Sequence, residues 1–266
     1  RNDRYRRNES RRGRKVSYRR VNGLKQLIIK LIDIFVKIWL RIKDTFWRVR
    51  DFFYRKVTKA PQVASVDDTI DEIVKNKRSI ARFGDGEIKL AAGKNISFQV
   101  NSKKIRDKMR EVLSSNVDGL MIGIADIFDN GERYDEVTNK HWKKHLARFR
   151  GVWYKYLLKD KTYYNASMTR QYIGLRHKEE SGEIFEHIKK IWDNRDVVII
   201  EGEMSRLGVG NDLLDNAKSV KRILGPSSEA FSKYDEILDE AKKLDKDVLI
   251  LLALGPAATC LAYDLH

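Results

Sequence analysis

Two runs of apolar residues in the last third of the chain constrain its fold more than any other feature. Residues 197–200 read Val-Val-Ile-Ile and residues 248–254 read Val-Leu-Ile-Leu-Leu-Ala-Leu, without alternation between apolar and polar positions. Strands that are apolar on both faces are covered on both faces, as in a parallel sheet between layers of helices. The sequence therefore predicts an α/β fold with a Rossmann-like, mostly parallel sheet and helices on both faces.

Other segments complete this pattern of alternating strands and helices. Strands are predicted at residues 79–83, 119–124, 163–167 and 220–224. Apolar residues at helical spacing predict helices at residues 67–74, 102–113, 139–158, 181–192, 211–217 and 230–238, and from residue 257 onward. Ligands of such sheets bind beyond the carboxyl ends of the strands, so the loops after these strands are where a site is expected.

Positive charge is concentrated in the first 60 residues. They hold 20 Lys and Arg against 5 Asp and Glu, whereas residues 61–266 hold 34 against 33. A basic catalytic groove for nucleic acid would need its excess charge in the body of the domain, so nucleic acid is disfavoured as a partner. The one cysteine, Cys260, excludes an internal disulfide and a zinc site built from several thiolates, and it indicates the reducing cytoplasm.

The N-terminal segment divides into two predicted parts ahead of a domain at residues 61–266. Residues 1–22 are basic and nearly free of apolar residues, which predicts a disordered arm. In residues 23–58 charged residues recur every three or four positions, from Lys30, Asp33 and Lys37 onward, as one polar stripe on an otherwise apolar helix. The charges exclude a membrane span, and no signal peptide is recognisable. We expect this helix to lie on an anionic membrane surface; packing against a partner helix is the alternative, and RNA binding is favoured least.

A first cluster of polar residues follows the predicted strand 79–83 and reads Arg82-Phe83-Gly84-Asp85-Gly86-Glu87. Two carboxylates at positions i and i+2 of an extended turn can share one hard divalent cation. The glycines at 84 and 86 would let a phosphate or sugar approach the backbone. The alternative is an exposed turn without a metal.

Two further clusters follow the apolar strands. The segment Glu201 to Asp212 places Gly208 and Gly210 just ahead of the predicted helix 211–217, an arrangement that offers amide groups to an anion, with Ser205 and Arg206 as further donors. It has neither the spacing of a dinucleotide-binding loop nor that of a Walker A loop, which disfavours a dehydrogenase or a P-loop kinase. The last cluster, Gly255-Pro256-Ala257-Ala258-Thr259, could donate to a phosphate through Thr259. Ordinary βα loops are the alternative for both.

One pair of histidines has a spacing that a metal site could use. His141 and His145 stand four residues apart on a predicted helix, but no Glu lies in the zincin position and no third ligand is evident. We interpret both as surface histidines.

In their order along the chain, the three clusters resemble the bacterial glycosyltransferases of GT-D fold, over roughly residues 64–266. The resemblance implies a metal-dependent enzyme whose D-x-E motif, here Asp85 and Glu87, is associated with Mn²⁺ (or Mg²⁺) and a nucleotide sugar, typically UDP-glucose. It also implies that Arg82, Ser205 and Arg206 lie near the donor diphosphate. The rest of the predicted donor-binding set comes from the clusters themselves: Gly84, Gly86, Gly208, Gly210, Asn211, Gly255 and Thr259.

The predicted function is transfer of a hexose from a nucleoside diphosphate sugar to a glycan, glycoprotein or lipid-linked acceptor in bacterial surface-glycan or glycoprotein synthesis. The location expected for such an enzyme with this helix is the cytoplasm, peripheral to the inner face of the cell membrane. If the reaction inverts the anomeric centre, Asp212, Glu201 or Glu203 could serve as the base, and we place Asp212 with Asp85 and Glu87 in the catalytic set. A non-catalytic membrane- or nucleic-acid-binding module and a nucleotide-sugar hydrolase are the alternatives. Members of the resembled family continue past Ala262-Tyr263-Asp264-Leu265, so part of the sheet edge or acceptor side is expected to lie outside this sequence.

Overall fold

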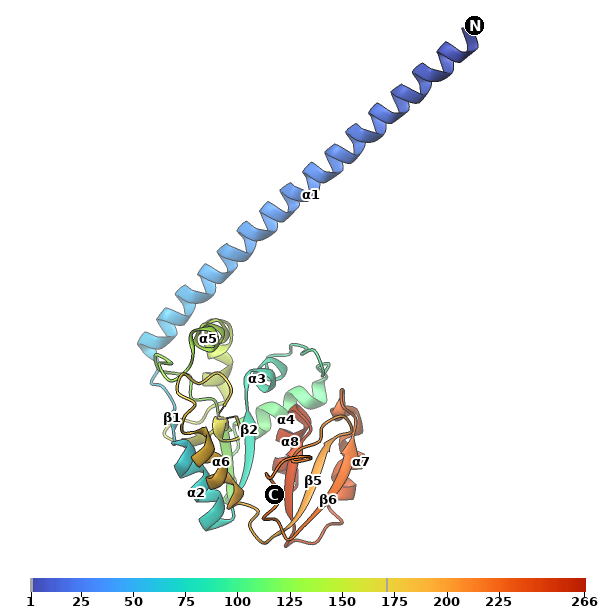
Figure 1. Ribbon diagram of the computed structural model, residues 1–266. Helices are drawn as coiled ribbons and strands as arrows, with labels where there is room; N and C mark the ends of the chain where they lie inside the picture. Colours follow the sequence, from blue (N-terminus) through green and yellow to red (C-terminus); the bar gives the residue numbers. More distant parts are fainter. Residues whose placement is uncertain (1, 171) are drawn as a thin grey trace. The chain divides into compact units, whose positions relative to one another are not determined.

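The computed structural model describes the backbone of residues 2–170 and 172–266, and the side chains of residues 30–170 and 172–266 (Figure 1). The chain divides into two compact units, residues 1–53 and 54–266. The first consists of helix, and the second holds all of the strands.

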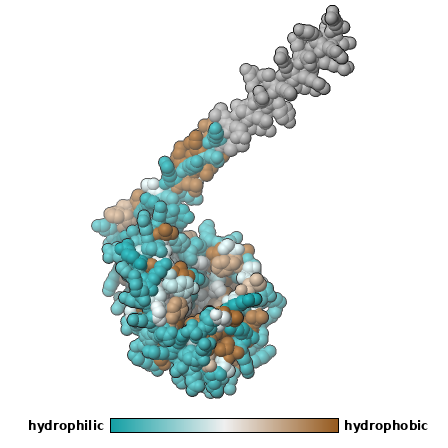
Figure 2. Space-filling model, in the orientation of Figure 1, coloured by the Kyte–Doolittle hydropathy of each residue, from teal (hydrophilic) through white to brown (hydrophobic). Residues whose placement is uncertain are grey.

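Helix α1 (Asn2–Val57) is longer than the helix predicted over residues 23–58. It also covers residues for which the sequence predicted a disordered arm. Arg and Lys are good helix formers, and no proline precedes Pro61, so nothing local stops the helix predicted over residues 23–58 from continuing toward the N-terminus. Figure 2 shows apolar surface beside polar surface along the part of α1 whose side chains are described, where Phe35, Trp39 and Phe46 are exposed. Among the residues described, no helix is long and apolar enough to cross a membrane.

In the described part of the second unit, seven parallel strands form two sheets. The first sheet has the order β1 (Gln62–Val63), β4 (Thr162–Asn165), β3 (Leu120–Ile124) and β2 (Ser79–Phe83). The second has the order β6 (Ser219–Gly225), β5 (Asp196–Gly202) and β7 (Leu249–Ala253). The predicted parallel α/β fold is confirmed, although its strands form two hydrogen-bonded sheets where the sequence predicted one.

Both faces of the central strands are buried, as their lack of alternation predicted. In β5, Val197 and Ile199 belong to one apolar cluster, whereas Val198 and Ile200 belong to the other. Each fully buried Val or Ile side chain contributes about 1.5–3 kcal/mol. Both clusters draw residues from both sheets, so the two sheets stabilise one domain.

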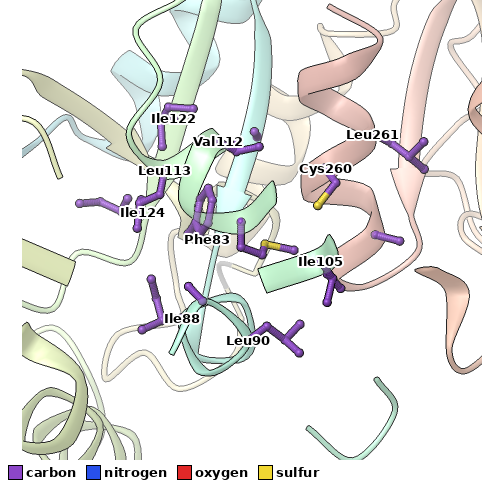
Figure 3. Close-up of a cluster of buried hydrophobic side chains, with 14 of the residues drawn as sticks. Phe83, Ile88, Leu90, Ile105, Val112, Leu113, Ile122, Ile124, Cys260 and Leu261 are labelled. Atoms are coloured by element: carbon purple, nitrogen blue, oxygen red, sulfur yellow. The ribbon is translucent and has the colours of Figure 1, made fainter. Parts of the chain in front are cut away.

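Helices cover the two faces. The helices α2 (Val66–Asn76) and α6 (Ser181–Lys189) contribute to the smaller cluster. The larger cluster includes residues of α3 (Asp85–Ala91), α4 (Lys103–Leu113), α5 (Glu136–Tyr156), α7 (Tyr234–Ala241) and α8 (Pro256–Asp264). Figure 3 shows side chains of β2, β3, α3, α4 and α8 meeting in the larger cluster: Phe83, Ile88, Leu90, Ile105, Val112, Leu113, Ile122, Ile124, Cys260 and Leu261.

Two local predictions are wrong. The predicted helix at 211–217 is a series of turns, because Asn211 Oδ1 accepts the Leu213 amide while Trp192 Nε1 donates to the Leu213 carbonyl at 2.8 Å. A helix would need the Leu213 amide and carbonyl for its own backbone hydrogen bonds. The segment after β2, predicted as an extended turn, is instead the start of α3. Short 3₁₀ helices follow β4 (η1, Ala166–Thr169) and precede α7 (η2, Ala230–Lys233).

Candidate active site

The carboxyl ends of the second sheet lie level with one another. In the strand register Gly202 pairs with Gly225, and Glu201 pairs with both Leu224 and Ala253. The loops that leave β5, β6 and β7 therefore start side by side. They border a cavity of about 330 Å³, within the size range of small-ligand sites. Its lining comprises Phe98, Gln99, Gly202, Met204, Ser205, Pro226, Ser227, Ser228, Ala230, Ala253, Leu254, Gly255 and Pro256.

Two of the glycines at this cavity allow a close approach of the chain. A Cβ atom on Gly202 would lie 3.1 Å from the Ser227 Cα atom, and one on Gly255 would lie 3.1 Å from the Phe98 ring. Gly255 also has a φ of 53° and stands just before α8, whose first residue is Pro256. The dipole of α8 favours negative charge at its N-terminus, although Pro256 has no amide hydrogen and the Ala258 amide already donates to the Gly255 carbonyl.

The Glu201 side chain is hydrogen-bonded to the backbone of the loop that follows β5. This side chain is only 3% exposed, pairs with Arg222 of β6, and accepts hydrogen bonds from the amides of Arg206 and Leu207. Burial raises the pKa of Glu201, but hydrogen bonds from Leu207, Ser205 and Arg222 outweigh it, and the pKa lies below its usual value. This buried, fully engaged carboxylate is therefore a structural anchor.

Most of the predicted residues of this loop lie outside the cavity lining. Ser205 lines the cavity, whereas Arg206, Gly208, Gly210, Asn211 and Asp212 are not among the described residues that do. Because residues 211–217 form no helix, the predicted helix N-terminus behind the two glycines is absent from the described structure.

The two remaining carboxylates predicted as bases are exposed. Asp212 Oδ2 pairs with Lys189 Nζ of α6 at 2.7 Å, in a second, polar cavity of about 430 Å³ whose lining shares no residue with the first. Hydrogen bonding and the charge of Lys189 lower the pKa of Asp212. Glu203 stands between the lining residues Gly202 and Met204, and its amide donates to the Gly225 carbonyl.

The D-x-E motif forms the first turn of α3. Gly84 is the N-cap, and its amide donates to Glu87 Oε2 at 2.8 Å. Asp85 Oδ2 pairs with Lys89 Nζ at 2.6 Å and lies 3.5 Å from His141 Nε2 of α5. Burial raises the pKa of Asp85, but the hydrogen bond and charge of Lys89, with the nearby histidines, outweigh burial. The pKa therefore lies below its usual value, and this carboxylate is ionised at neutral pH. Gly86 follows within the same turn.

The motif fits a divalent ion only in part. Positions i and i+2 of a helix point about 200° apart, and Glu87 already uses one oxygen to cap α3. Among the described residues no group of three or more His, Cys, Asp and Glu side chains converges on a metal position. Mg²⁺-type ions are commonly held by one or two carboxylates together with phosphate oxygens and water. The residues present therefore suit an ion shared with a bound diphosphate, and they do not suit a closed protein site.

Arg82 and Thr259 join the motif to α8. The Thr259 hydroxyl donates to the Arg82 carbonyl at 2.7 Å, so its proton is used within the fold, although the sequence predicted a phosphate contact. Arg82 Nε donates to the Ala166 carbonyl at 2.5 Å. Burial lowers the pKa of Arg82, while the charge of Glu87 acts in the opposite direction.

Sequence reasoning missed the surroundings of His145, which lies near the motif, and did not single out Asp126. His145 was interpreted as a surface residue, but it is buried, and its Nε2 atom accepts a hydrogen bond from Trp153 Nε1 at 3.1 Å. Burial lowers the pKa of His145 to about 3, against a smaller opposing effect of Asp85. Asp126 stands two residues after the end of β3 and pairs with Arg133. Its place after a buried strand was the signal that could have identified it.

Fold and site together define a class of protein: an α/β enzyme domain with a cavity beyond the carboxyl ends of parallel strands and a D-x-E motif at the start of a helix that follows another strand. The family model described as glycosyltransferase GT-D fold matches residues 80–266. This chain therefore belongs to the family of glycosyltransferases with the GT-D fold.

Two streptococcal proteins and two solved structures are similar to the chain. It is 38% identical over 205 residues to glycosyltransferase GlyD of Streptococcus pneumoniae serotype 4, across 77% of this chain and 25% of that protein. It is 37% identical over 204 residues to "Probable glycosyl transferase Gly" of Streptococcus gordonii, across 76% of this chain and 30% of that protein. The chain thus spans less than a third of each of these relatives.

A solved structure described as a new glycosyltransferase (DUF1792) from Streptococcus sanguinis has a TM-score of 0.75 and 36% identity, with 77% of both chains covered. A second, of the domain of unknown function 1792 and described as having a distinct glycosyltransferase fold, also has a TM-score of 0.75, with 34% identity, and covers 81% of this chain and 78% of that one.

Proposed function

We propose that this domain transfers a hexose, glucose in the first instance, from UDP-glucose to a glycan, glycoprotein or lipid-linked acceptor in bacterial surface-glycan or glycoprotein synthesis. The observation that carries the proposal is the cavity at the level carboxyl ends of β5, β6 and β7, closed on one side by the N-terminus of α8. It offers apolar walls for a base and a helix N-terminus for a diphosphate.

The cavity would bind and orient the donor through a small set of polar groups. Ser227 Oγ accepts the Met204 amide, so its own proton stays free to donate to a phosphate oxygen. Asp85, and Glu87 through its second oxygen, would hold a Mn²⁺ or Mg²⁺ ion together with the diphosphate. Such an ion supplies positive charge where the leaving nucleoside diphosphate becomes more negative. Arg82 and Arg206 lie outside the cavity lining, and they would act on the diphosphate through their positive charge.

An inverting reaction also needs a group that takes the acceptor proton. Of the three carboxylates predicted for this role, Glu201 is buried and engaged, and Asp212 is paired with Lys189 outside the cavity lining. Glu203 is exposed and stands between two lining residues. We therefore place Glu203 ahead of Asp212 as the base if the anomeric centre inverts.

A donor panel tests the proposed reaction. The purified chain is incubated with UDP-glucose, UDP-galactose, UDP-N-acetylglucosamine and GDP-mannose, with Mn²⁺ or EDTA, and with or without bacterial glycan extract. We expect sugar incorporation to be greatest with UDP-glucose and to require the metal. Nucleotide release without incorporation at any acceptor concentration would indicate a hydrolase. Turnover of no donor would contradict the proposal.

Helix α1 would hold the enzyme at an anionic membrane surface. Its exposed Phe and Trp side chains suit the headgroup boundary, and its cationic residues suit anionic lipids. The full chain should therefore bind phosphatidylglycerol vesicles more tightly than phosphatidylcholine vesicles, and less tightly as salt is added. Replacing both Phe35 and Trp39 by serine should weaken this binding about tenfold or more.

The matched control for the vesicle measurement is Val137→Ser, a change at an exposed apolar residue of α5. It should leave vesicle binding unchanged in a co-sedimentation assay. A different result would contradict the membrane role. If the wild type binds anionic and neutral vesicles equally, and the double replacement Phe35→Ser/Trp39→Ser abolishes self-association of the chain, then α1 packs against another helix.

A further inference from the structure

A tight turn at residues 96–99 lies between the D-x-E motif and the cavity. The Ile96 amide donates to the Gln99 carbonyl at 3.0 Å, and the Gln99 amide donates back to Ile96 at 3.3 Å. The Ile96 side chain lies 3.5 Å from the position of a Cβ atom on Gly86, and the Phe98 ring lies 3.1 Å from that of one on Gly255. The turn therefore contacts the motif helix on one side and the cavity on the other.

Hydrogen bonds made by Phe98, Gln99 and Val100 fix this turn to the segment that follows β6. Gln99, only 5% exposed, accepts the Phe231 amide through Oε1 and donates to Glu229 Oε2 at 2.9 Å through Nε2. Glu229 Oε1 accepts the Val100 amide at 2.8 Å, and the Glu229 amide donates to the Phe98 carbonyl at 2.8 Å. Glu229 has a φ of 53°, a left-handed conformation uncommon for a residue with a side chain. Such a conformation persists where the surrounding contacts determine it.

Phe98 is thus held firmly yet is 48% exposed, and it lines the cavity. An aromatic side chain that served only the core would be buried. We infer that Phe98 packs its ring against the face of the donor nucleobase, and that Gln99 and Glu229 are positioning residues that set the ring in place. The inference rests on the proposed nucleoside diphosphate donor and deepens it.

The lining around Phe98 favours the base over the sugar. Pro226, Leu254 and Pro256 present apolar surface there. The hydroxyl groups of a hexose would lose hydrogen bonds against such walls, whereas a planar base offers a π-face that an aromatic ring can stack on. The sugar would then extend away from this wall.

Calorimetric titration with two probes tests the assignment. UDP carries both the base and the diphosphate, and inorganic pyrophosphate carries only the latter. In the presence of Mn²⁺, Phe98→Ala should weaken UDP binding about tenfold and leave pyrophosphate binding unchanged, because stacking on one base is lost. Phe98→Trp should bind UDP as the wild type does. In turnover, Phe98→Ala should raise KM for UDP-glucose with little change in kcat.

The positioning residues are tested with a conservative pair of changes. Glu229→Ala should weaken UDP binding in the same way as Phe98→Ala. Glu229→Gln should weaken it less, because the amide keeps one accepting oxygen for the Val100 amide or Gln99 Nε2 but sets its NH2 group against the other donor. Melting temperatures show whether each variant is folded.

Each other outcome overturns the assignment. Equal loss of UDP and pyrophosphate binding would make Phe98 structural. Unchanged UDP binding with weakened UDP-glucose binding would place the ring against the sugar. A wild-type chain that binds pyrophosphate but no nucleoside diphosphate would overturn the proposed donor together with this inference.

Discussion

Asp85→Asn should abolish hexosyl transfer, lowering kcat/KM by at least about 100-fold, while the melting temperature changes by no more than about 2 °C. Asparagine has the same shape as aspartate but lacks the charge that a divalent ion and the Lys89 ammonium both need. The stability change is small because this ion pair is about one-third exposed, and exposed pairs contribute about 0–1 kcal/mol. Steady-state transfer assays and thermal melts measure the two effects.

Asp107→Asn is the matched control for this prediction. Asp107 also pairs with a lysine four residues away on a helix, Lys103 of α4, and is similarly exposed. Its replacement should leave both activity and melting temperature unchanged. Glu87→Gln should cost less activity than Asp85→Asn, because a glutamine oxygen can still accept the Gly84 amide. Full activity of Asp85→Asn in EDTA would contradict the role proposed for the carboxylate.

Arg222→Ala should destabilise the domain by about 3 kcal/mol, since it leaves the buried Glu201 carboxylate without its cationic partner. Arg222 also donates to the Leu207 carbonyl at 2.7 Å, so the loop that contributes Ser205 to the cavity loses a second support. Urea denaturation should show a lower midpoint, and donor binding should weaken in parallel.

A double replacement separates the buried charge from the lost packing. If the cost of Arg222→Ala comes from an uncompensated charge, adding Glu201→Gln should recover part of the lost stability, because a neutral amide costs less to bury than a carboxylate. Lys221→Ala, at the exposed neighbour on β6, should change stability by less than about 0.5 kcal/mol. A loss below about 1 kcal/mol for Arg222→Ala would show that the pair is not a main support of the loop.

The sequence predicted the order and type of most elements because their signals are local. The unbroken apolar runs at 197–200 and 248–254 required cover on both faces, and the structure buries alternate residues of β5 in two separate clusters. The predicted strand at residues 79–83 has the same bounds as the observed strand β2. The positions of Asp85 and Gly255, each two residues after the end of a strand, likewise followed from the pattern of βα units.

Tertiary structure alone decided how the loops are used, because the deciding contacts join residues far apart in the chain. The Trp192 side chain donates a hydrogen bond to the Leu213 carbonyl, and residues 211–217 form turns in place of the predicted helix. The Thr259 hydroxyl donates a hydrogen bond to the backbone carbonyl of Arg82, 177 positions away. Glu201 can stabilise the loop after β5 as a buried carboxylate because its pairing strand β6 places Arg222 beside it. Periodicity and turn residues report the local environment of a side chain, whereas the partner that satisfies a polar group is chosen when the sheets and helices pack.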